Sequence, residues 1–267
     1  MIDSENAPSP PRPKEGKGLR DRTAGILLAL SFLTRLPVPR WVHAGSPPLQ
    51  IGPEVLLLAG LLLGSLLAFG AEVFLRFFPT FPSLFLTLIL LFVWVFLTGA
   101  LHLDGVADTV ECAYACVPPE EKPRIRKDPR KGVFGILALI LFVFSKGAGL
   151  LLAHPLPLAL FLAPILARSA LPAVAHILVG RHLPESGGLG RLLLSGGRVR
   201  PVVVLSAAVL LSWILAGGRG LAASGAVVIG MLVLGRVHLG KVDGFSGDMA
   251  GFLVESGEIV CLWALSL

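Results

Sequence analysis

Long runs of apolar residues without charge constrain this chain more than any other feature. A helix needs about 20 mostly apolar residues to cross a bilayer, and several segments here meet that requirement. The chain of 267 residues is 54% hydrophobic and only 15% charged, with a mean hydropathy of +0.81. A transmembrane β-barrel would alternate apolar and polar residues, and these runs do not alternate. The sequence therefore predicts an all-α protein, a polytopic bundle of membrane-spanning helices.

Seven runs are long enough to span the membrane. They are residues 53–76, 83–101, 133–153, 156–179, 201–217, 221–239 and 249–267. The earlier segment 24–40 is apolar for only about ten residues, so we expect an interfacial or re-entrant helix there. Residues 1–22 are rich in proline and charge and lack an apolar core, which predicts a disordered tail and not a signal peptide. Residues 23–267 would then form a single transmembrane catalytic domain.

The basic residues are unevenly distributed between the connections. All but four of the 23 Lys and Arg residues lie in the N-terminal segment or in and beside residues 102–132, 180–200 and 240–248. If the spans simply alternate, these regions share one side of the membrane, which the positive-inside rule makes cytoplasmic. We therefore predict a multi-pass protein of the cell (inner) membrane with a cytoplasmic N-terminus. The net charge of +6 reports topology and does not indicate nucleic-acid binding.

The segment HLDGVADTVE (102–111) places three acids at the end of one apolar run. Asp104, Asp108 and Glu111 follow i, i+4, i+7 spacing and share one face of a helix. Carboxylates held together at bilayer depth are unfavourable unless a cation neutralises them. Mg²⁺ prefers oxygen ligands and typically takes one or two carboxylates plus substrate phosphates. The pattern predicts a Mg²⁺ site, although a solvated acidic helix end would show the same spacing.

Two further charged connections contain glycines beside acids or bases. RIRKDPRKGVFG (124–135) precedes a span, and its bases and glycines suit the binding of phosphate oxygens near a helix N-terminus. GKVDGFSGDMAG (240–251) adds aspartates in a glycine-rich turn before the last span. Each loop alone could be an ordinary polar flank. Together with 102–111 on one predicted face, they indicate a Mg²⁺–diphosphate site at the membrane surface.

Two basic side chains fall inside predicted spans. Lys146 and Arg168 are costly there unless they are paired or face a polar cavity, although snorkelling to the interface is an alternative. Glu255 and Glu258 share a face of the last span and are candidate partners. His102 could contact phosphate or serve as a structural hydrogen-bonding group.

At these motifs the chain resembles the cobalamin synthase family, the adenosylcobinamide-GDP ribazoletransferases. The resemblance is carried by LSFLTRLPVPR (30–40), GALHLDGVADTVE (99–111), RKDPRKGVFG (126–135) and GFSGDMAGFLVESGE (244–258). It implies Mg²⁺-dependent transfer of adenosylcobinamide phosphate from adenosylcobinamide-GDP to α-ribazole or its 5′-phosphate, with release of GMP. The chain departs from the family pattern at Glu111 and Cys112, where Asp-Gly is usual, and at Pro129 and Val133, where Ser and Thr are usual.

We therefore expect an active site on the cytoplasmic face with residues in three roles. The expected metal ligands are Asp104, Asp108, Glu111 and Asp248. The expected catalytic residues are Asp108, Arg130, Lys131 and Lys146. The expected substrate-binding residues are His102, Asp128, Gly132, Arg168, Ser246 and Gly247.

Other readings of the same features stay open. A membrane phosphotransferase that uses a CDP-linked lipid precursor would need the same acids and Mg²⁺. A transporter would place its acids near the bilayer midplane, and a non-catalytic scaffold would tolerate their loss. The partners expected are the corrinoid-GDP and α-ribazole substrates and the lipid bilayer, without nucleic acid. Self-association and association with other cobalamin-assembly enzymes are both left open.

Overall fold

The computed structural model describes residues 19–43, 49–118, 122, 131–180, 189–194, 197–242 and 244–267. These residues form helices and contain no strand, which confirms the all-α prediction. The helices are α1 (Leu19–Thr34), the 3₁₀ helix η1 (Arg40–Val42), α2 (Pro53–Phe77), α3 (Ser83–Thr98), α4 (Leu101–Tyr114), α6 (Val133–Leu152), α7 (Leu156–Val179), α8 (Leu189–Leu194), α9 (Val199–Leu239) and α10 (Gly247–Ser266).

The bundle is built around α7 and α10. Helix α7 packs against α2, α9 and α10, and α10 also packs against α4 and α6. Most of α7 is buried, and its small and aliphatic residues leave no polar stripe for water. The outer helices instead expose large apolar side chains, such as Phe92, Phe96 and Phe144, as expected for a surface that contacts lipid.

Five helices are long and apolar enough to cross a membrane. Helices α3 and α4 make a sixth candidate if the pair counts as one span, although its two halves meet at 87°. The predicted span 83–101 is therefore too long, because α3 ends at Thr98. Gly99 and Ala100 both have left-handed backbone conformations, with φ of 59° and 57°, and these turn the chain into α4.

Helix α9 is a hairpin of two arms. Gly217 (φ 58°, ψ −137°) breaks its helical geometry. The Ser212 hydroxyl donates a hydrogen bond of 3.0 Å to the carbonyl of Gly220, whereas eight residues of straight helix would separate these positions by about 12 Å. The two arms correspond to the predicted segments 201–217 and 221–239.

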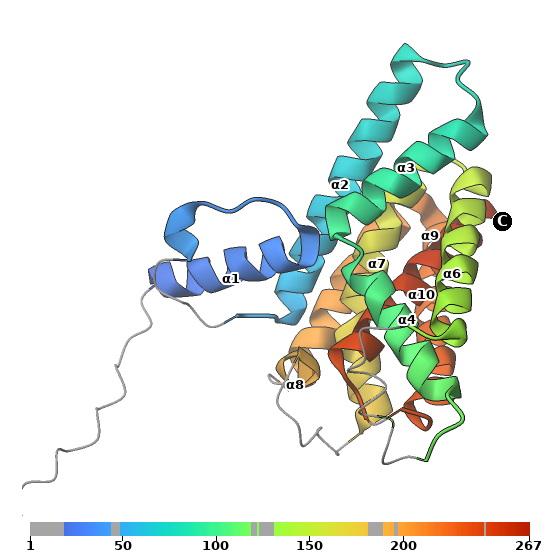
Figure 1. Ribbon diagram of the computed structural model, residues 1–267. Helices are drawn as coiled ribbons and strands as arrows, with labels where there is room; N and C mark the ends of the chain where they lie inside the picture. Colours follow the sequence, from blue (N-terminus) through green and yellow to red (C-terminus); the bar gives the residue numbers. More distant parts are fainter. Residues whose placement is uncertain are drawn as a thin grey trace, which may run out of the picture.

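Helix α1 projects sideways from the bundle and lies across its long direction (Figure 1). It ends at Thr34, and Pro37 and Pro39 then prevent the helix from continuing. The short helix and its orientation agree with the prediction that segment 24–40 is not an ordinary span.

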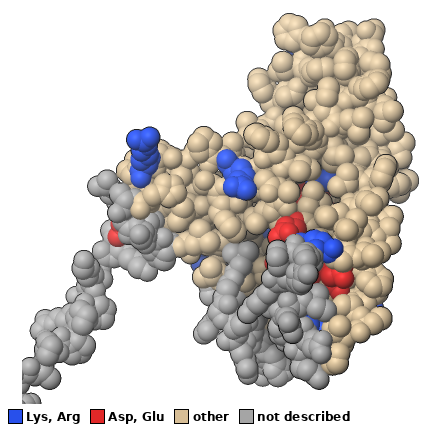
Figure 2. Space-filling view, viewed as in Figure 1, with Lys and Arg blue, Asp and Glu red and all other residues tan. Residues whose placement is uncertain are grey.

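The connections gather at two opposite ends, as simple alternation of the helices requires. At one end, Lys122 donates to the carbonyl of Lys241, and Arg198 Nη2 donates to the carbonyl of Gly180 at 3.2 Å. At the other end, Arg219 Nη2 donates to the carbonyl of Leu265 at 2.6 Å. On the face shown in Figure 2, acidic and basic atoms lie across the middle and lower part of the molecule, and the lobe at the upper right is almost free of them.

Candidate active site

The acidic residues of α4 share one face, and Lys131 lies against that face. The Lys131 ammonium donates to Oδ1 of Asp108 and lies 3.5 Å from Oδ1 of Asp104. The side chain of Asp104 is 66% exposed and that of Asp108 only 12%, so the pair extends from the surface into the protein. The i, i+4 spacing thus brings two carboxylates to one cation, as the sequence predicts.

The charge of Lys131 is stabilised by its two partners. Partial burial disfavours the ammonium, but the hydrogen bond and the negative charge of Asp108, with a contribution from Asp104, raise the pKa of Lys131 above its ordinary value. Lys131 is therefore protonated at neutral pH. The site provides a fixed positive charge directly before the first turn of α6.

Glu111 lies at the N-terminus of α6. Its Oε2 accepts a hydrogen bond of 2.7 Å from the backbone N–H of Gly135. A Cβ at Gly132 would collide with the Glu111 carboxylate, so the absence of a side chain there permits this approach. The sequence predicted that these glycines would let an anion reach a helix N-terminus, and in this structure that anion is Glu111.

A cavity of about 250 Å³ joins two of the predicted loops. His102 and Asp104 of α4 line it together with Gly247 and Asp248 at the start of α10. Its other walls are apolar and come from α1, α2, α4, α7, α8 and α10 and from Ile51 before α2. We call this space the acid cavity. The negative charges of Asp104 and Asp248 both act on Asp108, so these three predicted metal ligands influence one another electrostatically.

The N-terminus of α10 is fixed beside this cavity. Ser246 is the N-cap residue, and its hydroxyl accepts a hydrogen bond of 3.2 Å from the backbone N–H of Met249. Gly247 and Asp248 begin the helix. A helix N-terminus is favourable for an anion, so it suits a phosphate in the acid cavity.

Two glycines allow α4 and α10 to approach closely. A Cβ at Gly105 would lie 2.6 Å from the carbonyl oxygen of Asp248. A Cβ at Gly251 would lie 3.2 Å from Cα of His102. Gly105 and Gly251 are not among the site residues expected from the sequence. The sequence does show a glycine within each of these two motif-bearing helices. A glycine alone, however, does not indicate which helix packs against it.

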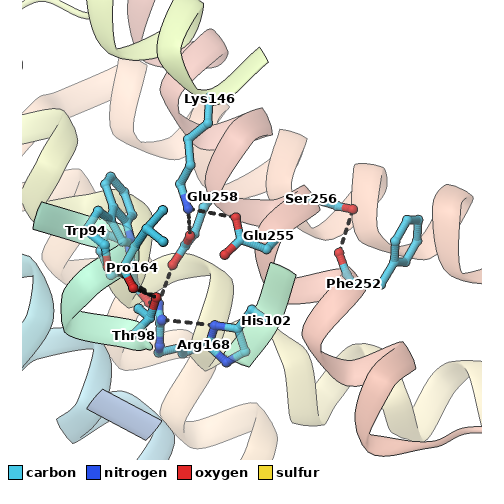
Figure 3. Close-up of polar contacts among 11 residues, drawn as sticks. Trp94, Thr98, His102, Lys146, Pro164, Arg168, Phe252, Glu255, Ser256 and Glu258 are labelled. Atoms are coloured by element: carbon cyan, nitrogen blue, oxygen red, sulfur yellow. Dashed lines mark hydrogen bonds and ion pairs between the residues drawn. The ribbon is translucent and has the colours of Figure 1, made fainter. Parts of the chain in front are cut away.

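Lys146 and Arg168 lie together in a buried charge cluster, as Figure 3 shows. Lys146 Nζ donates to Glu255 Oε2 at 2.7 Å and also to Glu258, and Arg168 Nη1 donates to Oε1 of Glu258. Two acids thus neutralise two bases from α6 and α7. The expectation that Glu255 and Glu258 pair with these bases is confirmed. The cluster is separate from the exposed carboxylate of Asp104.

His102 connects the charge cluster to the acid cavity. Its Nδ1 lies 3.4 Å from Arg168 Nη2, and it also lines the cavity beside Asp104. A guanidinium can only donate, so Nδ1 accepts and the hydrogen resides on Nε2. Trp94 of α3, whose ring centroid lies 4.2 Å from Lys146 Nζ, is a further neighbour of the cluster that the sequence analysis did not single out.

Some predicted site residues lie outside the described residues, namely Asp128 and Arg130. Within the described part of the chain, no group of three or more His, Cys, Asp or Glu side chains is arranged to hold a metal ion by itself. The structure brings Asp104, Asp108, Lys131, Asp248 and Gly247 together. It places Glu111 and Gly132 at the start of α6, and Lys146 and Arg168 in the interior.

Comparison with known proteins agrees with this arrangement of motifs. The family model for cobalamin-5-phosphate synthase matches residues 25–266. Adenosylcobinamide-GDP ribazoletransferase of Pseudomonas paraeruginosa is 36% identical over 257 residues, which cover 93% of this chain and 100% of the relative. The enzyme of the same name from Stutzerimonas stutzeri is 36% identical over 91% of this chain and 97% of its own length.

A more distant relative is matched over nearly as much of its length. Adenosylcobinamide-GDP ribazoletransferase of Brevibacillus brevis is 33% identical over 90% of this chain and 96% of its own length. No solved structure matches the chain. The match to the family model includes α1 from residue 25 onward, all three motif-bearing connections and α10, and the chain therefore belongs to the cobalamin-5-phosphate synthase family of enzymes.

Proposed function

We propose that this enzyme transfers adenosylcobinamide phosphate from adenosylcobinamide-GDP to α-ribazole or its 5′-phosphate at the acid cavity. The observation that carries the proposal is the meeting of Asp104 and Asp248 from distant motifs in one cavity, with the N-terminus of α10 beside them. A corrinoid diphosphate requires carboxylates that bind a cation, a helix N-terminus that binds an anion, and an apolar wall. The family and the names of the relatives support the same reaction.

The carboxylates suit Mg²⁺ bound jointly with the substrate. Lys131 Nζ already lies between oxygens of Asp104 and Asp108, so this pair accommodates positive charge. Magnesium is usually held by one or two carboxylates together with phosphates and water, so a third protein ligand is not required. When bound, Mg²⁺ would neutralise the diphosphate and the charge on departing GMP.

The remaining chemistry falls to the residues of the chain. A ribazole hydroxyl oxygen bonds to the cobinamide-side phosphorus, the bond from that phosphorus to the bridging oxygen breaks, and GMP leaves with the electron pair. The hydroxyl proton passes to Asp108 or Asp248, which are both half-buried, whereas Asp104 is exposed. Lys131 places a fixed ammonium beside them, which lowers the free energy of the negative charge that develops.

Purified protein in detergent tests the proposal directly. We expect GMP release when adenosylcobinamide-GDP and α-ribazole are supplied with Mg²⁺, loss of that release with a chelator, and no CMP release from CDP-diacylglycerol. Turnover of the CDP-lipid instead would refute the proposal and favour a lipid phosphotransferase.

Asp104→Asn should reduce GMP release at least about 100-fold, because a neutral amide replaces an exposed carboxylate at the site. The matched control is Glu72→Gln, which neutralises an exposed acid on α2 that lines no cavity described above. Normal cobalamin synthesis by Asp104→Asn in a complementation assay would contradict the assignment.

A further inference from the structure

The end of α1 carries an arginine where a glycine would be expected. Arg35 follows the last helical residue, Thr34, with φ of 54°, and its N–H donates to the carbonyl of Ser31 at 2.9 Å. This left-handed position after a helix is usually occupied by glycine, because a side chain there is strained. Such strain in a non-glycine residue often marks a functional site. The side chain of Arg35 is therefore a candidate for a role that glycine cannot provide.

The side chain of Arg35 lies across the bend between α3 and α4. A Cβ at Gly99 would collide with Nε and Cγ of Arg35, so the arginine occupies the space that this glycine leaves open. Gly99 and Ala100 adopt left-handed conformations at the same point. Three unusual backbone positions thus meet immediately before α4, the helix that carries Asp104. Arg35 therefore lies beside the start of the helix that carries the acidic face.

Arg35 lines a second cavity, of about 650 Å³, which we call the Arg35 cavity. Ser31 and His43 add polar side chains to its wall. Phe32 and Leu101 line both this cavity and the acid cavity, so the two are neighbours. Among the described residues, no carboxylate forms an ion pair with the Arg35 guanidinium. The guanidinium is exposed and available for an anion.

We infer that the Arg35 cavity binds the 5′-phosphate of the acceptor, α-ribazole 5′-phosphate, and that Arg35 is the residue that recognises it. This inference rests on the proposed function. A phosphomonoester carries about −1.5 to −2 charges at pH 7 and three acceptor oxygens. The acid cavity is proposed to hold the diphosphate of the other substrate, so the 5′-phosphate needs a cation of its own outside that cavity.

The adjacency of the two cavities also suits one acceptor. The attacking hydroxyl and the 5′-phosphate are carried by the same ribose, so their two subsites must be adjacent. Leu101 borders both cavities, and Asp104 lies one helical turn further along α4 on the same face. A planar guanidinium can hold two phosphate oxygens at once, a geometry that lysine does not reproduce.

The test compares the two acceptors in GMP-release assays. Arg35→Ala should lower kcat/KM for α-ribazole 5′-phosphate about 10- to 100-fold, the usual effect of losing charge-assisted hydrogen bonds, and change kcat/KM for unphosphorylated α-ribazole by less than about 3-fold. Arg35→Lys should give an intermediate preference. The matched control is Arg40→Ala, which removes the same charge from the exposed helix η1 outside both cavities and should leave both values unchanged.

The outcomes are distinguishable. Equal losses for both acceptors in Arg35→Ala, or no loss for either, would overturn the assignment of Arg35 while leaving the proposed function intact. An equal change of acceptor preference in Arg40→Ala would also overturn it, because the effect would then be one of general surface charge. Failure of the wild-type enzyme with both acceptors would instead refute the proposed function itself.

Discussion

At the scale of single residues, the buried charged side chains show which ion pairs the sequence predicts and which depend on the fold. Lys146 is 3% exposed, and Arg168 and Glu258 are each 0% exposed. Charges at such positions are tolerated only when each has an opposite partner. The i, i+3 spacing of Glu255 and Glu258 on one helix made them candidate partners from the sequence alone. The structure decided the pairing, because Glu258 bonds both bases.

Removing the shared acid should be costly. Glu258→Gln leaves Arg168 without its carboxylate and Lys146 with only Glu255, so we expect the free energy of unfolding to fall by about 3–5 kcal/mol. Thermal unfolding in detergent, followed by tryptophan fluorescence, measures the change.

The control for that variant is the same substitution in an exposed Glu–Arg ion pair. Glu54 and Arg200 form an ion pair of 2.6 Å with side chains 47% and 57% exposed, so Glu54→Gln should cost only about 0–1 kcal/mol. Equal losses of stability in the two variants would show that burial does not determine how much the Glu258 contacts contribute to the free energy of unfolding.

At the scale of helices, the acidic face of α4 was predictable and its environment was not. The spacing of the three acids fixes their common face, because helical periodicity depends only on local sequence. The same periodicity does not say that Glu111 reaches α6 while Asp104 faces α10. Nor does it predict the 87° bend before α4, where Gly99 and Ala100 adopt left-handed conformations and Arg35 packs against Gly99.

The close approach of α4 and α10 gives a prediction at this scale. Gly105→Ala places a Cβ 2.6 Å from the carbonyl oxygen of Asp248, so α10 must shift. The shift separates Asp248 from Asp104, and kcat should fall about 10- to 100-fold, as is usual for a displacement of about 1 Å at a reacting site. GMP release measures the effect.

Gly225→Ala is the matched control for this helix-packing variant. Gly225 lies within α9, and no atom lies within 4 Å of a Cβ built on it. Alanine is the better helix former by roughly 0.8–1 kcal/mol, so activity should be unchanged and stability equal or higher. Full activity of the Gly105→Ala enzyme would mean that the α4–α10 contact does not position the site.

At the scale of the whole molecule, the alternation of connections was the part of the fold that the sequence predicted best. Residues 115–118 follow the acidic helix at one end of the bundle (Figure 1). Gly217–Gly218 form the turn of the α9 hairpin at the other end, where Arg219 donates to the carbonyls of His154 and Leu265. Each helix carries the chain from one end of the bundle to the other. The end at which a connection lies therefore follows from the number of apolar runs that precede it. The side of the membrane on which each end lies stays a prediction from the distribution of Lys and Arg.

Cysteine labelling tests that orientation. Cys116 is exposed whereas Cys112 and Cys261 are buried, so a membrane-impermeant maleimide should label Cys116 selectively. We expect labelling in inverted vesicles and protection in intact spheroplasts, because the acidic end should face the cytoplasm. A Gly218→Cys variant in a Cys116→Ser background should show the opposite pattern, since Gly218 is exposed with no atom near its Cβ. Labelling of both sites from the same side would contradict the predicted topology.

The sequence by itself determined that this chain forms membrane helices, which residues share the acidic face, and which connections lie at the same end. These properties depend on apolar length, on helical periodicity and on the order of elements, all of which are local or additive along the chain. Only the tertiary structure decided that Gly105 lies against Asp248, that Glu258 joins Lys146 to Arg168, and that Arg35 rests on Gly99. These contacts join residues that are 64 to 143 positions apart, and they depend on how helix surfaces interlock, which the pattern of any one helix does not specify.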